Sequence, residues 1–221
     1  MEPFVTHRGR VAVLDWSDVN TDLIIPARYL KRIERTGYGA LLFADKRYAN
    51  GGAPPVDDPD AQVILNPDFP LNASSNQGTV LLAGRNFGCG SSREHAVWAV
   101  SQGGYRAVIA PGKGEGFADI FEGNALNNGL LPIELDDADW QALLDASKAE
   151  EAIEVTIDLR DQSVTLHSSR GQDQRFGFDI SEADRHRLLN GLDAISETLL
   201  NDADIRKHEQ ATPAWLTPQS A

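Results

Sequence analysis

The chain has 221 residues, of which 41% are hydrophobic and 24% charged, and its formal net charge is −13. These values are typical of a globular protein with one sizeable core, and they argue against a protein that binds nucleic acid or an anionic membrane. Residues 1–110 hold 11 acidic and 11 basic side chains while residues 111–221 hold the other 22 and 9, so an anion-binding site is expected in the first half.

Four short apolar runs predict buried strands, at residues 11–14, 79–83, 107–110 and 131–134. Asp22 precedes an apolar run that is typical of another strand, and the basic residues after that run predict a solvated helix. The stretch from residue 50 to residue 70 is rich in Gly, Pro and Asp, which predicts a long irregular loop.

A glycine-rich loop at residues 84–90 follows one predicted strand and leads into a helix predicted over residues 92–101. Strand, loop, helix and strand in this order make a βαβ unit, whose two strands are parallel. A second helix is predicted over residues 117–128, where Gly129 ends it.

The acidic half has a different pattern. Carboxylates at residues 136–139 open a helix, and alternating residues over 153–159, 163–167 and 175–179 predict an antiparallel ribbon. Two more helices are expected, from Ser181 to Gly191 and over residues 202–210. We therefore expect an α/β fold in a single domain over residues 1–221, with a core over about 10–135, a C-terminal antiparallel and helical elaboration over about 136–210, and a loose tail over 211–221.

Cys89 is the single cysteine of the chain. One thiol cannot form an internal disulfide, and it cannot by itself hold an iron–sulfur cluster or a zinc ribbon. The N-terminus lacks the basic-then-apolar pattern of a signal peptide, and no apolar run approaches the length of a membrane span. These features predict a cytoplasmic protein without a metal of its own.

The most informative stretch runs from Gly84 to His95, between a strand and a helix. Backbone N–H groups at a helix N-terminus bind anions, and a glycine such as Gly90 lets a ligand approach the backbone. Arg93 opposes the helix dipole, which suggests a carboxylate or phosphate partner. An alternative remains open, because Ser91 and Glu94 also fit a simple capping box.

Two other interpretations of this stretch are weaker. Gly88 and Gly90 suggest a dinucleotide-binding loop and hence a nucleotide-binding oxidoreductase, but Arg93 replaces the third glycine of that motif. His95 has no second histidine at metal-ligand spacing, so it is expected to be a packing residue.

Taken together, these stretches resemble the small-subunit family of 3-isopropylmalate dehydratase, and the same core resembles the swivel domain of aconitase. The long Gly-Ser-Ser-Arg-Glu-His run is the most specific match, and five further segments follow the family in order. The matching segments are residues 20–26, 66–69, 81–96, 117–121, 128–132 and 188–193.

The resemblance implies a three-layer β/β/α swivelling fold and a hydro-lyase of leucine biosynthesis. It implies a large partner subunit that carries a 4Fe-4S cluster, while this chain binds no cofactor and no metal. It also implies that Ser91 is the catalytic base, that Ser92 supports it, that Arg93 binds a carboxylate of a dicarboxylate substrate and that Asp22 is an active-site acid. The loop after Asp22, with Arg28 and Lys31, and the backbone at Gly90 would contact the substrate and set specificity.

Two departures from the family pattern are visible, an insertion at residues 112–116 and the sequence Asn-Ala-Leu-Asn-Asn at residues 124–128. Neither touches the Ser-Ser-Arg run, but both leave the substrate open. The alternatives are the same chemistry on 2-methylmalate (through citraconate) or homoaconitate, and a non-catalytic subunit that only stabilises its partner.

Overall fold

The computed structural model describes residues 1–49, 63–169, 171 and 173–213. Within this part of the chain seven strands form one sheet: β1 (Thr6–Leu14), β2 (Val80–Ala83), β3 (Ala107–Pro111), β4 (Leu131–Leu135), β5 (Glu154–Asp158), β6 (Ser163–His167) and β7 (Gln174–Gly177). The α-helices are α1 (Thr21–Ile24), α2 (Ala44–Arg47), α3 (Glu94–Gln102), α4 (Asp119–Asn128), α5 (Asp137–Ala149), α6 (Glu182–Asn190), α7 (Ala194–Leu199) and α8 (Asp202–Ala211).

The first strand, β1, joins two halves of the sheet, whose order is β4-β3-β2-β1-β5-β6-β7. Residues 11–14 of β1 pair in parallel with β2, whereas residues 6–10 pair antiparallel with β5. The parallel half continues through β3 and β4, and the antiparallel half continues through β6 and β7. The predicted parallel βαβ core and the antiparallel extension are both confirmed.

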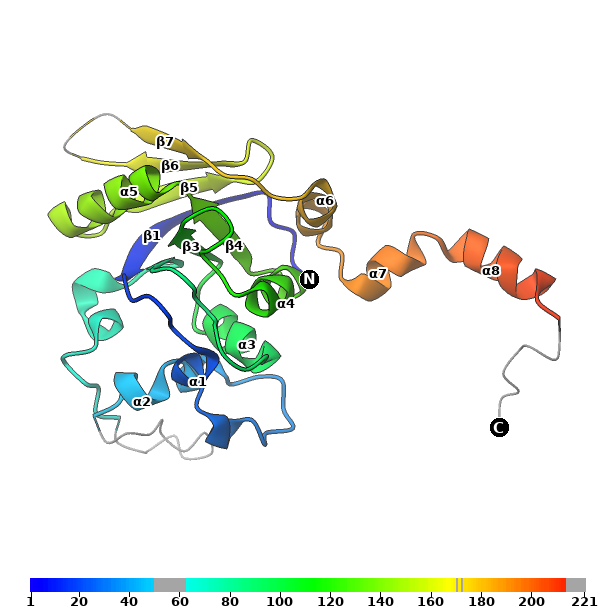
Figure 1. The fold of residues 1–221 in the computed structure, drawn as a ribbon, viewed down its shortest axis with the longest axis horizontal. Helices are drawn as coiled ribbons and strands as arrows, with labels where there is room; N and C mark the ends of the chain where they lie inside the picture. Colours follow the sequence, from blue (N-terminus) through cyan, green and yellow to red (C-terminus); the bar gives the residue numbers. More distant parts are fainter. Residues whose placement is uncertain (50–62, 170, 172, 214–221) are drawn as a thin grey trace.

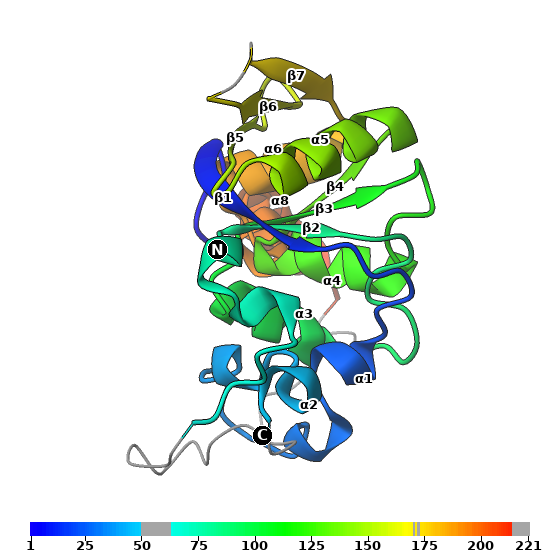
Figure 2. The ribbon, with the colours of Figure 1, turned by 90° about the vertical axis from the view of Figure 1, so that its left-hand side faces the viewer.

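Alternate residues of the parallel strands face two separate apolar layers, because successive side chains of a strand point to opposite faces. On one face Leu81 and Val108 pack with residues of α3 and α4. On the other face Leu82 and Ile109 pack with residues of α5, β5 and β6. Figure 2 shows antiparallel strands at the top, parallel strands in the middle and α3 and α4 below them, which is the expected order of layers.

The strand expected directly after Asp22 is wrong, because this segment forms the helix α1. The side chain of Asn20 accepts a hydrogen bond from the amide of Leu23 at 2.8 Å and so caps the first turn. Capping of this kind satisfies an N–H group that has no partner inside the helix.

The prediction of a solvated basic helix after this segment is also wrong. Only a short 3₁₀ helix, Ala27–Tyr29, forms there. Pro26 separates this turn from α1, and Ile25 before it is extended, with φ −142° and ψ 113°. A residue before proline avoids the helical region for steric reasons, so the two turns cannot merge into one helix.

The helices of the acidic half begin and end close to the predicted residues. Ser181 caps α6 by accepting from the amide of Asp184 at 3.1 Å, and Gly191 ends it with a φ of +64°. The sequence interpretation missed α7, which Asp193 caps by accepting from the amide of Ser196 at 2.7 Å.

The last two helices form an arm. Figure 1 shows α7 and α8 extending away from the sheet and its covering helices. Neither helix has a buried residue, and Ile195, Leu199 and Leu200 are exposed by 59% or more. By contrast Leu188 of α6 is fully buried in the layer that contains α5.

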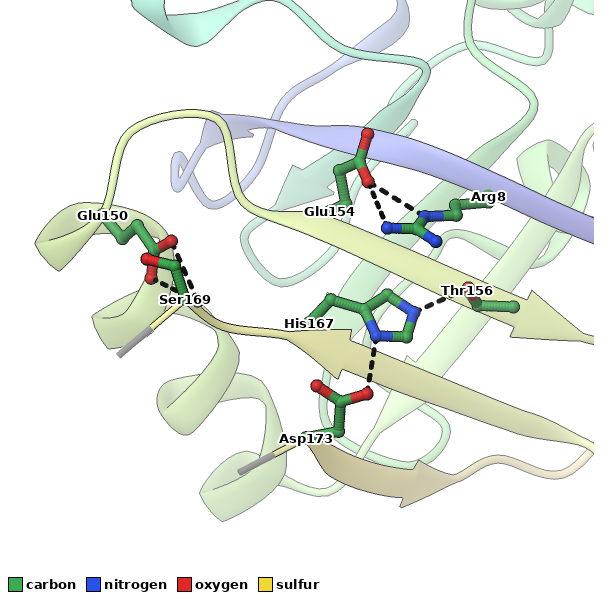
Figure 3. A network of polar contacts seen from close by, with 7 residues as sticks. All are labelled: Arg8, Glu150, Glu154, Thr156, His167, Ser169 and Asp173. Carbon is green, nitrogen blue, oxygen red and sulfur yellow. Dashed lines mark hydrogen bonds and ion pairs between the residues drawn. The ribbon is translucent and has the colours of Figure 1, made fainter. Parts of the chain in front are cut away.

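A polar network crosses the open side of the antiparallel strands (Figure 3). The guanidinium of Arg8 on β1 lies 2.8 Å from a carboxylate oxygen of Glu154 on β5. On β6, the ring of His167 lies 2.8 Å both from the hydroxyl of Thr156 and from a carboxylate oxygen of Asp173. Because these contacts join β1, β5, β6 and the segment before β7, they stabilise the pairing of strands that are far apart in sequence.

The loop expected over residues 50–70 falls mostly outside the described residues, and so does most of the tail over 211–221. Pro70, the last residue of that loop, begins the 3₁₀ helix Pro70–Asn72. Among the described helices, none has the length and apolarity that crossing a bilayer requires.

Candidate functional site

A cavity of about 840 Å³ lies where the loops after β1 and β2 meet the start of α4. Its walls come from three segments of the chain, within residues 17–21, 85–93 and 114–121. Gly90, Ser92 and Arg93, three of the predicted site residues, are part of these walls. The anion site expected in the first half of the chain therefore coincides with a cavity large enough for a small organic acid.

Two glycines shape the loop before α3. Gly88 has a φ of +78°, and a Cβ there would lie 2.2 Å from Cγ of Phe121 on α4. Gly90 has a φ of +89° and is exposed at the cavity wall. Glycine adopts this left-handed conformation without steric cost, so the chain can turn here and present its backbone to the cavity.

The segment containing Asp22 lies against this loop, although about 70 residues separate the two in sequence. The amide of Thr21 donates to the carbonyl of Cys89 at 2.9 Å, and its hydroxyl donates to the carbonyl of Ser91 at 2.7 Å. The amide of Gly88 donates to the carbonyl of Val19 at 2.7 Å. These bonds fix Asp22 relative to the residues that precede α3.

Arg93 and Asp22 form an ion pair, with 2.5 Å between Nη1 and Oδ1. The Arg93 side chain is only 13% exposed, whereas that of Asp22 is 56% exposed. Nη1 is buried, and the Asp22 carboxylate lies beside it as a charged partner without the alignment of a hydrogen bond. A guanidinium at a cavity wall can bind a carboxylate ligand.

The capping box suggested for Ser91 does not form. α3 begins at Glu94 with Arg93 in the capping position, and the Arg93 side chain makes no capping hydrogen bond. Ser91 and Ser92 are both exposed, and Ser92 lies in the cavity wall. With its structural alternative removed, Ser91 remains available for chemistry beside the cavity.

The structure places Arg28 and Lys31 away from the cavity walls. Arg28, on the 3₁₀ helix after α1, forms an ion pair with Asp45 on α2, and it also lies 4.6 Å from the ring centre of Tyr29. The hydrogen bond that Arg28 donates to the Asp45 carboxylate is the main reason why the pKa of Arg28 is raised. Lys31 is exposed. The geometry thus brings Asp22, Gly90, Ser91, Ser92 and Arg93 together, and leaves the two other basic residues on a neighbouring turn.

Sequence reasoning missed Arg85, which also lines the cavity. A single arginine in a glycine-rich loop has no motif of its own, so no local pattern identifies it as a site residue. The insertion at residues 112–116 brings Gly114 and Glu115 into the cavity wall, and Glu115 pairs with Arg85 at 3.1 Å.

Two residues of the Gly84–His95 stretch, His95 and Cys89, lie in packed surroundings. The ring of His95 lies 4.8 Å from that of Trp98 and 5.5 Å from that of Tyr38, which agrees with its predicted packing role. Burial, and secondarily the Asp18 carboxylate, raise the pKa of the Cys89 thiol, which disfavours a thiolate there. In the described part of the chain no three His, Cys, Asp or Glu side chains are grouped so as to hold a metal ion.

Known proteins resemble this chain over nearly its whole length. The aconitase C-terminal domain family matches residues 1–138. The 3-isopropylmalate dehydratase small subunit of Teredinibacter turnerae is 50% identical over 221 residues, which cover 98% of this chain and 97% of the relative. The chain belongs to the 3-isopropylmalate dehydratase small-subunit family. The small subunits of Shewanella oneidensis and Bacillus pumilus are 44% and 46% identical and are each covered over 99% of their length.

A solved structure supports membership of the small-subunit family. The crystal structure of 3-isopropylmalate dehydratase from Methanocaldococcus jannaschii is 26% identical, with a TM-score of 0.57, and the match covers 93% of this chain and 99% of that chain. The expected fold, an aconitase C-terminal-like α/β fold with parallel core strands and an antiparallel extension, is confirmed. The family is that of a hydro-lyase of leucine biosynthesis, and the designation of its members as small subunits implies a large partner.

Proposed function

We propose that this chain is the small subunit of a cytoplasmic 3-isopropylmalate dehydratase, active only as a hetero-oligomer with a large subunit. The reaction interconverts 2-isopropylmalate and 3-isopropylmalate by dehydration to 2-isopropylmaleate and rehydration. The observation that carries the assignment of the site is the largely buried Arg93 guanidinium at the cavity wall, paired with Asp22 and next in sequence to the two serines.

Dehydration begins with removal of a proton from carbon next to a carboxylate, which builds up negative charge. A site for this step needs a base and fixed cations. We assign the base to the hydroxyl of Ser91, with Ser92 next to it as support. Arg93 and the N-terminus of α3 lie directly after them and lower the cost of an alkoxide at this position.

Arg93 binds a substrate carboxylate in this proposal, and Asp22 holds the guanidinium in place until it does. The planar guanidinium can donate to two oxygens at once, which fixes the orientation of a bound carboxylate. The Asp22 side chain is 56% exposed, so a substrate can reach it in its assigned role as an active-site acid.

The large subunit is assigned the 4Fe-4S cluster, because the one cysteine of this chain cannot provide a set of thiolate ligands. When bound, such a cluster supplies a Lewis acid for the departing hydroxyl. The residues of this chain bind and orient the substrate and move the proton. Gly90 lets the substrate approach the backbone, and the turn with Arg28 and Lys31 is assigned a role in specificity for the side-chain substituent.

The first experiment measures hydration of 2-isopropylmaleate by the anaerobically reconstituted complex of both subunits. Arg93→Ala is expected to lower kcat/KM by about 100-fold or more, the loss typical of a charge-assisted contact to a buried ion. Ser91→Ala is expected to lower kcat by about 100-fold or more, since general bases contribute this much. Arg175→Ala removes an exposed ion pair with Asp161 on the antiparallel ribbon and serves as the matched control.

Near-normal activity of the Ser91→Ala complex would overturn the role of that serine. Substrate profiling of the wild-type complex with citraconate and homoaconitate separates the related substrates from the isopropyl compound. A complex whose activity is unaffected by either site variant would support a stabilising subunit instead. Titration of the isolated chain with NAD tests the oxidoreductase alternative, which requires binding.

A further inference from the structure

A second guanidinium, that of Arg85, lines the same cavity as Arg93. Among the described residues of the cavity wall, these two are the ones with a cationic side chain. Arg85 lies shortly after β2, and Arg93 lies on the other side of the glycine loop, directly before α3. The loop therefore carries one positive charge at each end of its path around the cavity.

Two carboxylates hold the guanidinium of Arg85 in place. Nη1 lies 3.1 Å from an oxygen of Glu115, and Nη2 lies 2.5 Å from an oxygen of Asp137 at the start of α5. A Cβ at Gly112 would lie 2.1 Å from Nη1, so the guanidinium occupies space that only a glycine leaves open. The position of this charge is thus defined by its surroundings.

The two carboxylate partners are themselves largely exposed, Glu115 by 75% and Asp137 by 65%. Ion pairs between solvated groups contribute little to stability. A ligand carboxylate in the cavity can therefore displace Glu115 at small cost, and a direct bond to the guanidinium replaces the one that is lost.

The inserted loop at residues 112–116 positions Glu115 against Arg85. The carboxylate of Glu134 accepts hydrogen bonds from the amide of Gly114 at 2.5 Å and from the amide of Gly116 at 2.8 Å. The loop is also tied to the glycine loop, because the amide of Asn86 donates to the carbonyl of Glu115 at 2.9 Å. These bonds hold the backbone of Glu115 in place and so keep its exposed carboxylate at the cavity wall.

We propose that Arg85 binds the second carboxylate of the dicarboxylate substrate, in competition with Glu115. This inference rests on the proposed function, in which Arg93 binds the first carboxylate. Each carboxylate of the substrate then meets one guanidinium. The inserted loop tunes the affinity through the competing charge that it presents.

The test compares Arg85→Gln and Glu115→Gln in the reconstituted complex, with Arg175→Gln as the matched control on the antiparallel ribbon. The readouts are KM for 2-isopropylmaleate and the inhibition constants of 2-isopropylsuccinate, which keeps both carboxylates, and 4-methylpentanoate, which keeps one. Arg85→Gln is expected to raise KM and the 2-isopropylsuccinate constant by about tenfold or more, with a much smaller effect on 4-methylpentanoate. Glu115→Gln is expected to lower the same two constants by about twofold to fivefold.

Arg85→Gln and Glu115→Gln break the same ion pair but are expected to change KM and the 2-isopropylsuccinate constant in opposite directions. This difference in direction tests the proposal. A purely structural role of that pair predicts that both variants change the constants in the same direction, and this result would overturn the proposal. Equal effects of Arg85→Gln on the two inhibitors would also overturn it. The proposed function is tested by two separate measurements. These are the hydration of 2-isopropylmaleate by the wild-type complex and the loss of that activity in the Arg93→Ala complex.

Discussion

Glu122 on α4 lies among like charges. It is half-buried, and it faces Glu134 on β4, Asp119 on its own helix and Asp184 on α6. Burial first, and then these three carboxylates, raise the pKa of Glu122 above its ordinary value of 4.5. The folded chain therefore binds a proton at this residue more tightly than the unfolded chain does.

This shift predicts how the stability depends on pH. A group with a raised pKa in the folded state contributes stability that is present below pH 4.5 and is lost as the pH rises through its folded pKa. Glu122→Gln, which is neutral at every pH, is expected to be more stable than wild type at pH 7 and equally stable near pH 4. Urea unfolding of both proteins at these two pH values measures the difference. Glu209→Gln on the exposed arm is the control, and an equal gain there would contradict the argument.

At the residue scale the sequence identified the key charges but not their arrangement. Arg93 stands out because a cation before a helix is unfavourable, and Asp22 was identified through the family resemblance. Their contact depends on hydrogen bonds from Thr21 to Cys89 and Ser91, which connect segments about 70 residues apart. No local pattern encodes such a contact, and for the same reason Arg85 was missed.

At the element scale the glycine loop before α3 depends on tight packing as well as on backbone conformation. Gly88 and Gly114 have nearly the same φ, +78° and +79°. A Cβ at Gly88 would overlap Phe121, whereas a Cβ at Gly114 would have no neighbour within 4 Å. Substitution of each glycine by alanine therefore distinguishes the cost of a left-handed backbone, which both share, from the cost of a steric clash, which only Gly88 has.

Gly114→Ala is expected to lower the free energy of unfolding by about 1 kcal/mol, the cost of a left-handed alanine. Gly88→Ala adds a steric clash with an aromatic ring in the core and is expected to cost about 3 kcal/mol or more. Denaturant unfolding of both variants measures these costs. Equal losses would mean that Phe121 moves aside freely.

Elements with a local signal were predictable, whereas those that depend on distant partners were not. The buried parallel strands and the capped helix α6 follow from composition and end signals. The strand expected after Asp22 is instead the helix α1, because the cap from Asn20 outweighs the β propensity of Ile24. The polar first half of β1 was missed, since its pairing with β5 comes from residues about 150 positions away.

At the scale of the whole molecule, the distribution of charge along the chain is more informative about the site than the net charge is. The balanced half holds both arginines of the cavity, which suits a doubly negative substrate, and the surplus acid lies in the second half. That second half includes the arm of α7 and α8, which has no buried residue. The arm is therefore expected to contribute little to the stability of the isolated chain.

A chain that ends after Leu192 is expected to keep its thermal midpoint within about 3 °C of wild type. A loss of less than about 1 kcal/mol in the free energy of unfolding shifts the midpoint of a chain of this size by no more than that. A chain that ends after Ile180 also loses α6, whose Leu188 is fully buried and whose carbonyl accepts from the amide of Phe4. The free energy of unfolding of this shorter chain is expected to be lower than that of wild type by about 3 kcal/mol or more. Calorimetry of both truncated chains tests the comparison, and a large loss in the longer one would contradict it.

The double pairing of β1 has a consequence for synthesis on the ribosome. The half of β1 that pairs with β5 is made early, but its partner follows 152 residues later, as between Thr6 and Asp158. At translation speeds of about 5–20 residues per second, this edge waits for about 8–30 seconds in the nascent chain. Arg8 and Arg10 place charge on that edge, and Gly9 leaves it without a side chain. The charges of Arg8 and Arg10 are therefore expected to oppose pairing of this edge with other nascent chains during that interval.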